Sequence, residues 1–304
     1  MFIIQHKKFF LILSVIFMIV AIGAIAVFHL PLGIDFTGGS ILEVAYEKNT
    51  PPIEDVKNTF FQIGRDASVQ KTNKGYMIRT KELSDADHEM IISALSGAAG
   101  QEVLEERFSS IGPTIGAELK NRALIAITTV IFAIILFVAF AFRNVTKAMK
   151  AAGREGVGAW TFGLVAIIAL VHDILIPTGV FAVIGADINT LFVMALLAIL
   201  GFSVNDTIVV FDRIRENIIK DREEHGGKSF SDIVGASVSE TYTRSINTSL
   251  TTLFVLLTLY ILGGSATAHF ALVLSIGVIA GTYSSVFFAS PILVFLQERK
   301  NKEL

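Results

Sequence analysis

Ionisable residues interrupt two of the long apolar stretches in this sequence. His172 and Asp173 lie near the middle of the apolar residues 160–184, and Asp206 lies within residues 189–211. An ionisable side chain inside the hydrocarbon of a membrane costs free energy, and such residues usually belong to ion, proton or substrate paths. They are therefore the first candidates for chemistry.

Arg244 stands at the entry to a third stretch, residues 246–262, and Thr248 and Thr251 follow it on one helix face. Consecutive membrane helices run in opposite directions, so Asp206 and Arg244 are expected in the same half of the membrane. Burial disfavours the ionised form of a carboxylate, whereas a nearby guanidinium favours it. A carboxylate with such a partner can take up and release a proton as the partner moves, which is what a proton relay requires.

Structural explanations of these residues stay open. Arg244 can be a residue that only extends its charged end to the membrane surface. Asp173 can be a fixed partner of polar groups on a neighbouring helix, and His172 a packed core histidine. Asp206 is harder to explain in this way, because no opposite charge lies one turn away in its own stretch and Arg213 is nearly two turns on.

The composition indicates the environment in which these residues act. Over 304 residues, 53% are hydrophobic and 17% are charged, which predicts a membrane protein. The net charge of -2 gives no basic field, so we expect no nucleic-acid partner. The chain contains no cysteine, which excludes disulfides and thiolate chemistry. It also lacks a Gly-x-x-x-x-Gly-Lys-Ser/Thr phosphate-binding loop, and we expect no metal and no cofactor.

Six apolar stretches are long enough to cross about 30 Å of hydrocarbon. In the last of them, Gly277 and Gly281 form a small-residue pattern with Ser285 one turn on. This pattern predicts close helix packing and not a ligand site. The predicted spans are residues 9–28, 124–142, 160–184, 189–211, 246–262 and 270–296.

Lysine and arginine residues indicate the orientation of these spans, because positively charged loops remain in the cytoplasm. We predict that both termini are cytoplasmic. The predicted parts are residues 1–29 (N-terminus and first span), 30–122 (external domain), 123–296 (spans two to six with cytoplasmic loops) and 297–304 (cytoplasmic tail). The basic residues on the predicted cytoplasmic side are Lys7, Lys8, Arg143, Lys147, Lys150, Arg154, Arg213, Arg215, Lys220, Arg222, Lys228, Arg244, Arg299, Lys300 and Lys302.

The N-terminal segment also resembles a cleavable signal peptide, with Lys7 and Lys8, a short apolar core and the run 24–26 (AIA). However, the apolar run continues to Phe28, and cleavage would leave an odd number of spans. We therefore expect this segment to be retained as the first span.

The external segment is polar and patterned as a small α+β domain. Its order β-α-β-β-α-β predicts the ferredoxin-like arrangement, with a capping box at Ser84 before the second helix. This arrangement assigns no function. The segment has neither nucleophile-and-base nor metal-ligand spacing, so we expect no enzyme. The predicted strands are residues 41–46, 67–71, 76–80 and 102–111, the predicted helices 53–63 and 85–98, and the predicted hairpin turn 73–75.

Three longer strings resemble signatures of a known family. Residues 33–40 (GIDFTGGS) resemble the G-x-D-F-x-G-G signature of the SecD and SecF family, and residues 203–217 and 243–249 resemble the span-four signature and span-five entry of its SecF branch. The strings occur in the expected order, and the resemblance covers essentially the whole chain. The motif residues after the first span are Asp35, Phe36, Thr37, Gly38 and Gly39.

The resemblance implies a half-transporter of the resistance-nodulation-division type that pairs with SecD in a bacterial inner membrane. Such a pair uses the proton-motive force to pull unfolded preprotein, assisting the SecYEG channel and the SecA ATPase, with YajC as a further partner. It implies Asp206 as the proton carrier, Arg244 as the charge that tunes it, and Asp173 as a further member of the relay. The supporting polar residues are Ser203, Asn205, Asn247 and Thr248.

Two other functions stay open on this sequence. The chain can be half of a small-molecule or lipid exporter of the same architecture, or a passive assembly scaffold for SecD or an insertase. Protons and sodium ions are also not distinguished, because a carboxylate with Ser, Asn and Thr neighbours suits either ion.

Overall fold

The computed structural model of the protein describes residues 2–47, 49–72, 74–142 and 159–303. The chain forms two compact units: a helical unit, Met1–Pro31 with Ile125–Leu304, and an external unit, Leu32–Leu124. Four of the predicted cytoplasmic basic residues and one residue of the predicted hairpin turn lie outside the described residues: Arg143, Lys147, Lys150, Arg154 and Asn73.

Six helical segments within the described residues are long and apolar enough to cross a membrane, which confirms the predicted number of spans. The last span consists of three consecutive elements and not one helix. The helices are α1 (Phe2–Gln5), α2 (Lys7–Phe28), α6 (Pro113–Ala141), α8 (Ala159–Ile184), α9 (Thr190–Glu223), α10 (Phe230–Leu262), α11 (Ser265–Ser284), the π-helix η1 (Ser285–Ala289) and α12 (Ser290–Glu303).

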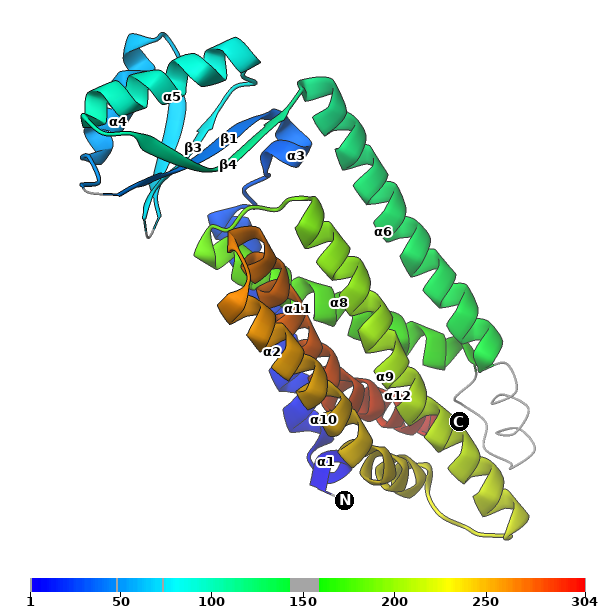
Figure 1. The fold of residues 1–304 in the computed structure, drawn as a ribbon. Coiled ribbons are helices and arrows are strands. Elements are labelled where there is room, and N and C mark those ends of the chain that lie inside the picture. Colours follow the sequence, from blue (N-terminus) through cyan, green and yellow to red (C-terminus); the bar gives the residue numbers. More distant parts are fainter. Residues whose placement is uncertain (1, 48, 73, 143–158, 304) are drawn as a thin grey trace. The chain divides into compact units, whose positions relative to one another are not determined.

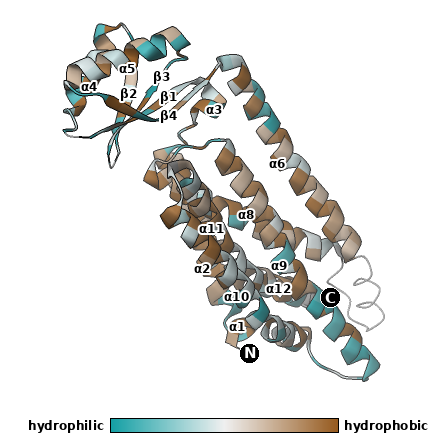
Figure 2. Ribbon diagram, in the orientation of Figure 1, coloured by the Kyte–Doolittle hydropathy of each residue, from teal (hydrophilic) through white to brown (hydrophobic). Residues whose placement is uncertain are grey.

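Helices α9 and α10 are longer than the apolar stretches that predicted them. The C-terminal part of α9 is hydrophilic (Figure 2) and is tied to α10 by an ion pair between Arg213 Nε and Glu240 Oε2 at 2.5 Å. The hydroxyl of Ser229 accepts a hydrogen bond from the backbone N–H of Asp232 and so caps the start of α10. These polar contacts continue both helices beyond the residues that hydropathy alone identifies.

The π-helix has a local cause in the sequence. Pro291 has no backbone N–H, and its ring would clash with the carbonyl of Phe287 in a regular α-helix. The preceding turn is widened, and the hydroxyl of Ser290 donates to the carbonyl of Ser285 at 3.2 Å. π-helical turns are rare and occur often at functional sites, so this segment is a candidate for a functional region.

Small residues allow close packing within the helical unit. A Cβ atom on Gly277 would lie 2.2 Å from Ile199 Cδ1, and one on Gly281 would lie 3.1 Å from Ser203 Cβ. The predicted packing role of this glycine pair is therefore confirmed, with α9 as its neighbour. Between α8 and α2, a Cβ on Gly179 would lie 2.7 Å from the Cα of Ala21.

An ion pair between Lys7 and Glu298 joins the start of α2 to α12, and Figure 1 marks both ends of the chain. An aromatic cluster joins α8 and α9: the Phe162 and Phe211 rings have centroids 5.1 Å apart, and Phe142 stacks on Phe162.

The external unit contains a four-stranded antiparallel sheet in the order β2-β3-β1-β4. Each β-α-β half has a strand of the other half between its own two strands, and α4 and α5 cover one face (Figure 1). The predicted capping box at Ser84 is present, with Asp87 as its second member. The elements are β1 (Gly39–Tyr46), α4 (Ile53–Gln62), β2 (Ala67–Lys71), β3 (Gly75–Thr80), α5 (Asp85–Ala99) and β4 (Val103–Ile111).

The chain enters the first strand after a short helix, α3 (Ile34–Thr37). Gly38 and Gly39 follow with φ values of 72° and 122°, a region that favours glycine. A Cβ on Gly38 would also lie 2.8 Å from the Cα of Pro113, and one on Gly116 would lie 2.8 Å from the nitrogen of Gly38. These glycines therefore allow the chain entering the unit to pack against the chain leaving it.

Candidate functional site

Asp206 is buried in the helical unit, with 7% of its surface exposed. Its Oδ1 accepts a hydrogen bond from the hydroxyl of Ser245 on α10 at 2.7 Å, and its Oδ2 accepts one from the hydroxyl of Ser285 on η1 at 2.9 Å. The carboxylate of α9 is thus held by two other helical segments.

Asp173 on α8 is fully buried and is held in a similar way. Its Oδ2 accepts a hydrogen bond from the hydroxyl of Ser284 at 2.8 Å and another from the hydroxyl of Ser203. Its Oδ1 lies 2.8 Å from Nδ1 of His172, which is also fully buried. Both carboxylates therefore depend on hydroxyl donors from neighbouring helices.

The two carboxylates belong to one connected arrangement. Ser203 and Asp206 lie one turn apart on α9, so the helix that carries one carboxylate also binds the other. Ser284 and Ser285 are consecutive residues, and each donates to a different carboxylate. Neither Ser245 nor Ser284 is a candidate on the sequence alone, and the sequence pattern around Ser285 predicts only packing. The only feature of the sequence that could have indicated these serines is a hydroxyl side chain within an apolar stretch.

Arg244 is exposed and does not pair with Asp206. The structure gives Arg244 no ion pair within the described residues; the adjacent Ser245 contacts the carboxylate instead. Thr248 is also exposed, and its hydroxyl donates to the carbonyl of Arg244 at 2.9 Å. Arg244 therefore lies on a face of α10 that the described part of the chain leaves uncovered.

The other supporting polar residues differ in their burial. Asn205 and Asn247 are exposed, whereas Ser203 is fully buried against Asp173. Of the four supporting residues predicted from the sequence, Ser203 alone reaches a carboxylate through a described hydrogen bond. Asn205, Asn247, Thr248 and Arg244 instead form a polar surface on α9 and α10.

This arrangement allows proton or cation uptake. A buried carboxylate held by neutral hydroxyls can be balanced by a bound proton or cation. The residues that the structure describes contain no group of three or more His, Cys, Asp or Glu side chains that could hold a metal ion.

Comparison with known proteins adds to this geometry. The family described as protein export membrane protein SecD/SecF, C-terminal, matches residues 91–152 and 158–299, and the SecD/SecF GG motif matches residues 23–50. The chain belongs to the SecD/SecF family. It is a multi-pass membrane protein related to protein translocase subunits.

Relatives of the family resemble the chain over most of its length. The protein translocase subunit SecF of Thermobaculum terrenum is 38% identical over 96% of this chain and 92% of its own. That of Anaerolinea thermophila is 35% identical, with the same coverage. A crystal structure of SecDF, a translocon-associated membrane protein from Thermus thermophilus, matches 98% of this chain with a TM-score of 0.81 and 29% identity. This chain spans 38% of that SecDF chain.

The candidate relay residues and the GG-motif residues lie in different units. Asp173, Asp206 and Arg244 fall within the C-terminal match, in the helical unit. The GG-motif residues fall in the external unit: Asp35 is half-buried, Phe36 is buried, and Thr37 donates its hydroxyl hydrogen bond to the carbonyl of Gly33 at 3.1 Å, followed by Gly38 and Gly39.

Proposed function

We propose that this chain acts as a SecF-type subunit that pairs with SecD and uses the proton-motive force to complete preprotein translocation. The proposal places it in a bacterial inner membrane, with both termini cytoplasmic. Its further partners are then the SecYEG channel, the SecA ATPase, YajC and the unfolded preprotein. The names of the relatives support the transport role.

The observation that carries this proposal is the pair of buried carboxylates held by hydroxyl groups. Asp206 and Asp173 are buried in helices that cross the membrane, where an ionised group is costly. A structural role would be served more cheaply by Asn or Ser, which carry no charge. In our proposal Asp206 takes up and releases the transported proton, and Asp173 is a further member of the path.

The exposed polar surface of α9 and α10 supports a membrane partner. Arg244, Asn205 and Asn247 would face hydrocarbon if the chain stood alone in the membrane, and each unsatisfied polar group there is unfavourable. A second set of membrane helices can cover this surface and supply hydrogen-bond partners. We propose SecD as that partner, and the SecDF match, of which this chain spans 38%, supports it.

The first test is gradient-driven export in membrane vesicles that contain the chain together with SecD. Asp206→Asn keeps the shape, and its oxygen can still accept one of the hydrogen bonds from Ser245 and Ser285 while its amide nitrogen donates to the other hydroxyl, but it cannot carry a proton. We expect export with a gradient to fall to the level without one, while the protein stays inserted. Glu224→Gln, the same chemical change at an exposed position of the loop after α9, serves as the control.

Imposing a pH gradient and a sodium gradient separately identifies the ion. Wild-type export in Asp206→Asn under both gradients would favour the passive scaffold. Gradient-dependent release of a small molecule or lipid, without an effect on preprotein, would favour the exporter.

The second test separates two roles of Arg244. If its guanidinium interacts with a carboxylate during the cycle, Arg244→Lys reduces gradient-driven export, because lysine lacks the planar fork that orients a carboxylate. If Arg244 only reaches the membrane surface, Lys replaces it without loss, since either side chain extends that far. The comparison uses equal amounts of inserted protein.

A further inference from the structure

His172 has a buried ring nitrogen that no partner satisfies. The side chain is fully buried on α8, and its Nδ1 lies 2.8 Å from Asp173 Oδ1. Its other nitrogen, Nε2, has no hydrogen-bond partner among the residues that the structure describes. Buried polar atoms are nearly always hydrogen-bonded, so an unsatisfied one in a functional region needs an explanation.

The contact with Asp173 determines which nitrogen is free to act. The carboxylate accepts hydroxyl hydrogen bonds on Oδ2 from Ser203 and Ser284, which leaves Oδ1 to accept the hydrogen of the ring. Nδ1 then carries the hydrogen of the neutral ring, and Nε2 presents a lone pair. A carboxylate that fixes one nitrogen of a histidine in this way orients the other nitrogen for proton transfer.

Two aromatic rings lie beside the ring of His172. The Tyr283 ring lies parallel to it with centroids 6.0 Å apart, and the Phe288 ring lies at 5.2 Å. Aromatic faces within about 6 Å attract a cation, and Asp173 does so directly.

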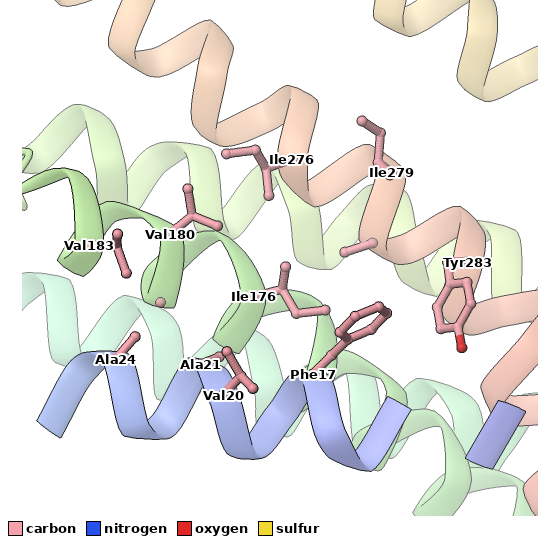
Figure 3. A pocket seen from close by; sticks show the side chains of 12 residues that line it. Phe17, Val20, Ala21, Ala24, Ile176, Val180, Val183, Ile276, Ile279 and Tyr283 are labelled. Carbon is pink, nitrogen blue, oxygen red and sulfur yellow. The ribbon is translucent and has the colours of Figure 1, made fainter. Parts of the chain in front are cut away.

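The ring is also separated from the lipid. Tyr283 stands at one end of an apolar groove of about 480 Å³ between α2, α8 and α11 (Figure 3). Its hydroxyl accepts a hydrogen bond from Ser14 of α2 at 3.2 Å, which fixes the tyrosine between the groove and His172. The groups that face His172 are thus Asp173 on its own helix, Ser203 on α9 beside Asp173, Tyr283 and Ser284 on α11, and Phe288 on η1.

We propose that His172 is a further proton-holding residue of the ion path, with Asp173 as its positioning residue. A proton taken up at Nε2 converts the neutral ring to imidazolium, and the pair of His172 and ionised Asp173 changes from a net charge of -1 to zero. Release of that proton restores the neutral ring. Two connections join Asp206 to this pair. Ser203, on the same helix as Asp206, bonds Asp173. The consecutive residues Ser284 and Ser285 bond Asp173 and Asp206, respectively.

This inference rests on the proposed function, and one substitution separates it from a role limited to bonding Asp173. In His172→Asn the amide nitrogen replaces Nδ1 and still donates to Asp173, but no titrating ring remains. A residue needed only to bond Asp173 would tolerate this change. We expect gradient-driven export to fall to the level without a gradient, in vesicles containing the complete chain and SecD. His225→Asn is the control, because His225 is exposed and has a positive φ of 51° that asparagine accepts.

A second measurement on the wild-type chain does not depend on any variant folding. Ring-nitrogen magnetic resonance with ¹⁵N-labelled histidine should contain one signal, absent from His172→Asn, that has hydrogen on Nδ1 alone at high pH. As the pH falls, the same signal should change to the doubly protonated ring. A ring that stays in one form across the pH range, or that carries its hydrogen on Nε2, would overturn the proposal. So would normal gradient-driven export in inserted His172→Asn.

Asp206→Asn, assayed in parallel, distinguishes a failure of the proposed role of His172 from a failure of the proposed function. Loss of export in Asp206→Asn with normal export in His172→Asn overturns the role of His172 and leaves the proposed function standing. Normal export in Asp206→Asn overturns the proposed function itself. If His172→Asn does not insert, His172→Gln and the wild-type resonance measurement decide the question.

Discussion

The external unit buries mainly apolar side chains between its sheet and helices, whereas the helical unit buries carboxylates and hydroxyls in addition to an apolar core. Phe60, Ile78 and Leu95 are each at most 1% exposed in the external unit. In the helical unit, Asp173 and Ser203 are fully buried, and the exposed positions carry large apolar residues such as Phe254.

The difference follows from the two solvents. In water, removing apolar surface from the solvent is the main favourable term in folding. In a bilayer, lipid chains are as apolar as the helices, so packing of small residues and interhelical hydrogen bonds hold helices together. The polar interior of the helical unit can therefore contribute to helix association and to ion transfer at the same time.

The largest expected effect on stability lies in the external unit. Phe60→Ala removes a large side chain from its apolar core and should lower the free energy of unfolding of this unit by about 3–5 kcal/mol. Hydrogen exchange of β1 in the complete chain measures the loss. Phe61→Ala is the matched control, because Phe61 is 80% exposed and its truncation should change stability by about 0.5 kcal/mol or less. Equal effects of the two changes would contradict the assigned core.

A smaller effect on stability, with a larger effect on function, is expected for Ser285→Ala. It removes one hydrogen-bond donor of Asp206, and interhelical hydrogen bonds in membrane proteins contribute on average about 0.6 kcal/mol. Gradient-driven export should nevertheless fall, since the carboxylate loses a group that orients it. Export in vesicles and unfolding in detergent measure the two effects separately.

Ser275→Ala is the matched control for that change. Ser275 lies on α11, is buried, and donates its hydroxyl hydrogen bond only to the carbonyl of Ala271 in its own helix, at 2.8 Å. Its removal should leave export unchanged. Equal loss of export in both variants would mean that any cavity in this region impairs the protein, and Ser285 would have no special relation to Asp206.

The sequence was sufficient for the elements but not for the contacts of the site. Apolar length predicted six spans, and alternation predicted the four strands to within two residues at each end, because these signals are local. The depth of a residue in the membrane also follows from its position along its own span. It indicated that the start of span five lies near Asp206, where Ser245 bonds the carboxylate. The rotation of a helix is set by its neighbours, however, and it turned Ser245 toward Asp206 and Arg244 away.

The serines of the last span were missed for a similar reason. Ser284 and Ser285 look like packing residues in the sequence, because a serine in an apolar helix usually bonds its own backbone. Their contacts with two carboxylates depend on the π-helical turn before Pro291 and on the close approach of Gly281 to Ser203. Neither condition can be read from one segment alone.

The smallest expected effect is local and concerns the start of α5 in the external unit. The pKa of Asp87 is lowered by hydrogen bonds from the hydroxyl and backbone N–H of Ser84, and by Arg65, whose Nη2 lies 2.8 Å from Asp87 Oδ2. The folded state therefore favours the ionised carboxylate. Its contribution to stability is present above the pKa of an unfolded aspartate, about 3.9, and is lost as the pH falls through the lower folded value.

The first turn of α5 should accordingly lose protection from hydrogen exchange as the pH is lowered below about 4. In Asp87→Asn this acid-dependent step should be absent, because the amide does not titrate, and protection should be lower at neutral pH. Asp85→Asn is the control: Asp85 is exposed in the same turn and interacts with the same helix dipole, but it is not part of the capping box. If Asp85→Asn removes the step as well, the dipole and not the capping box stabilises this turn. Protection factors corrected for the intrinsic pH dependence of exchange, measured on the complete chain, decide between the two.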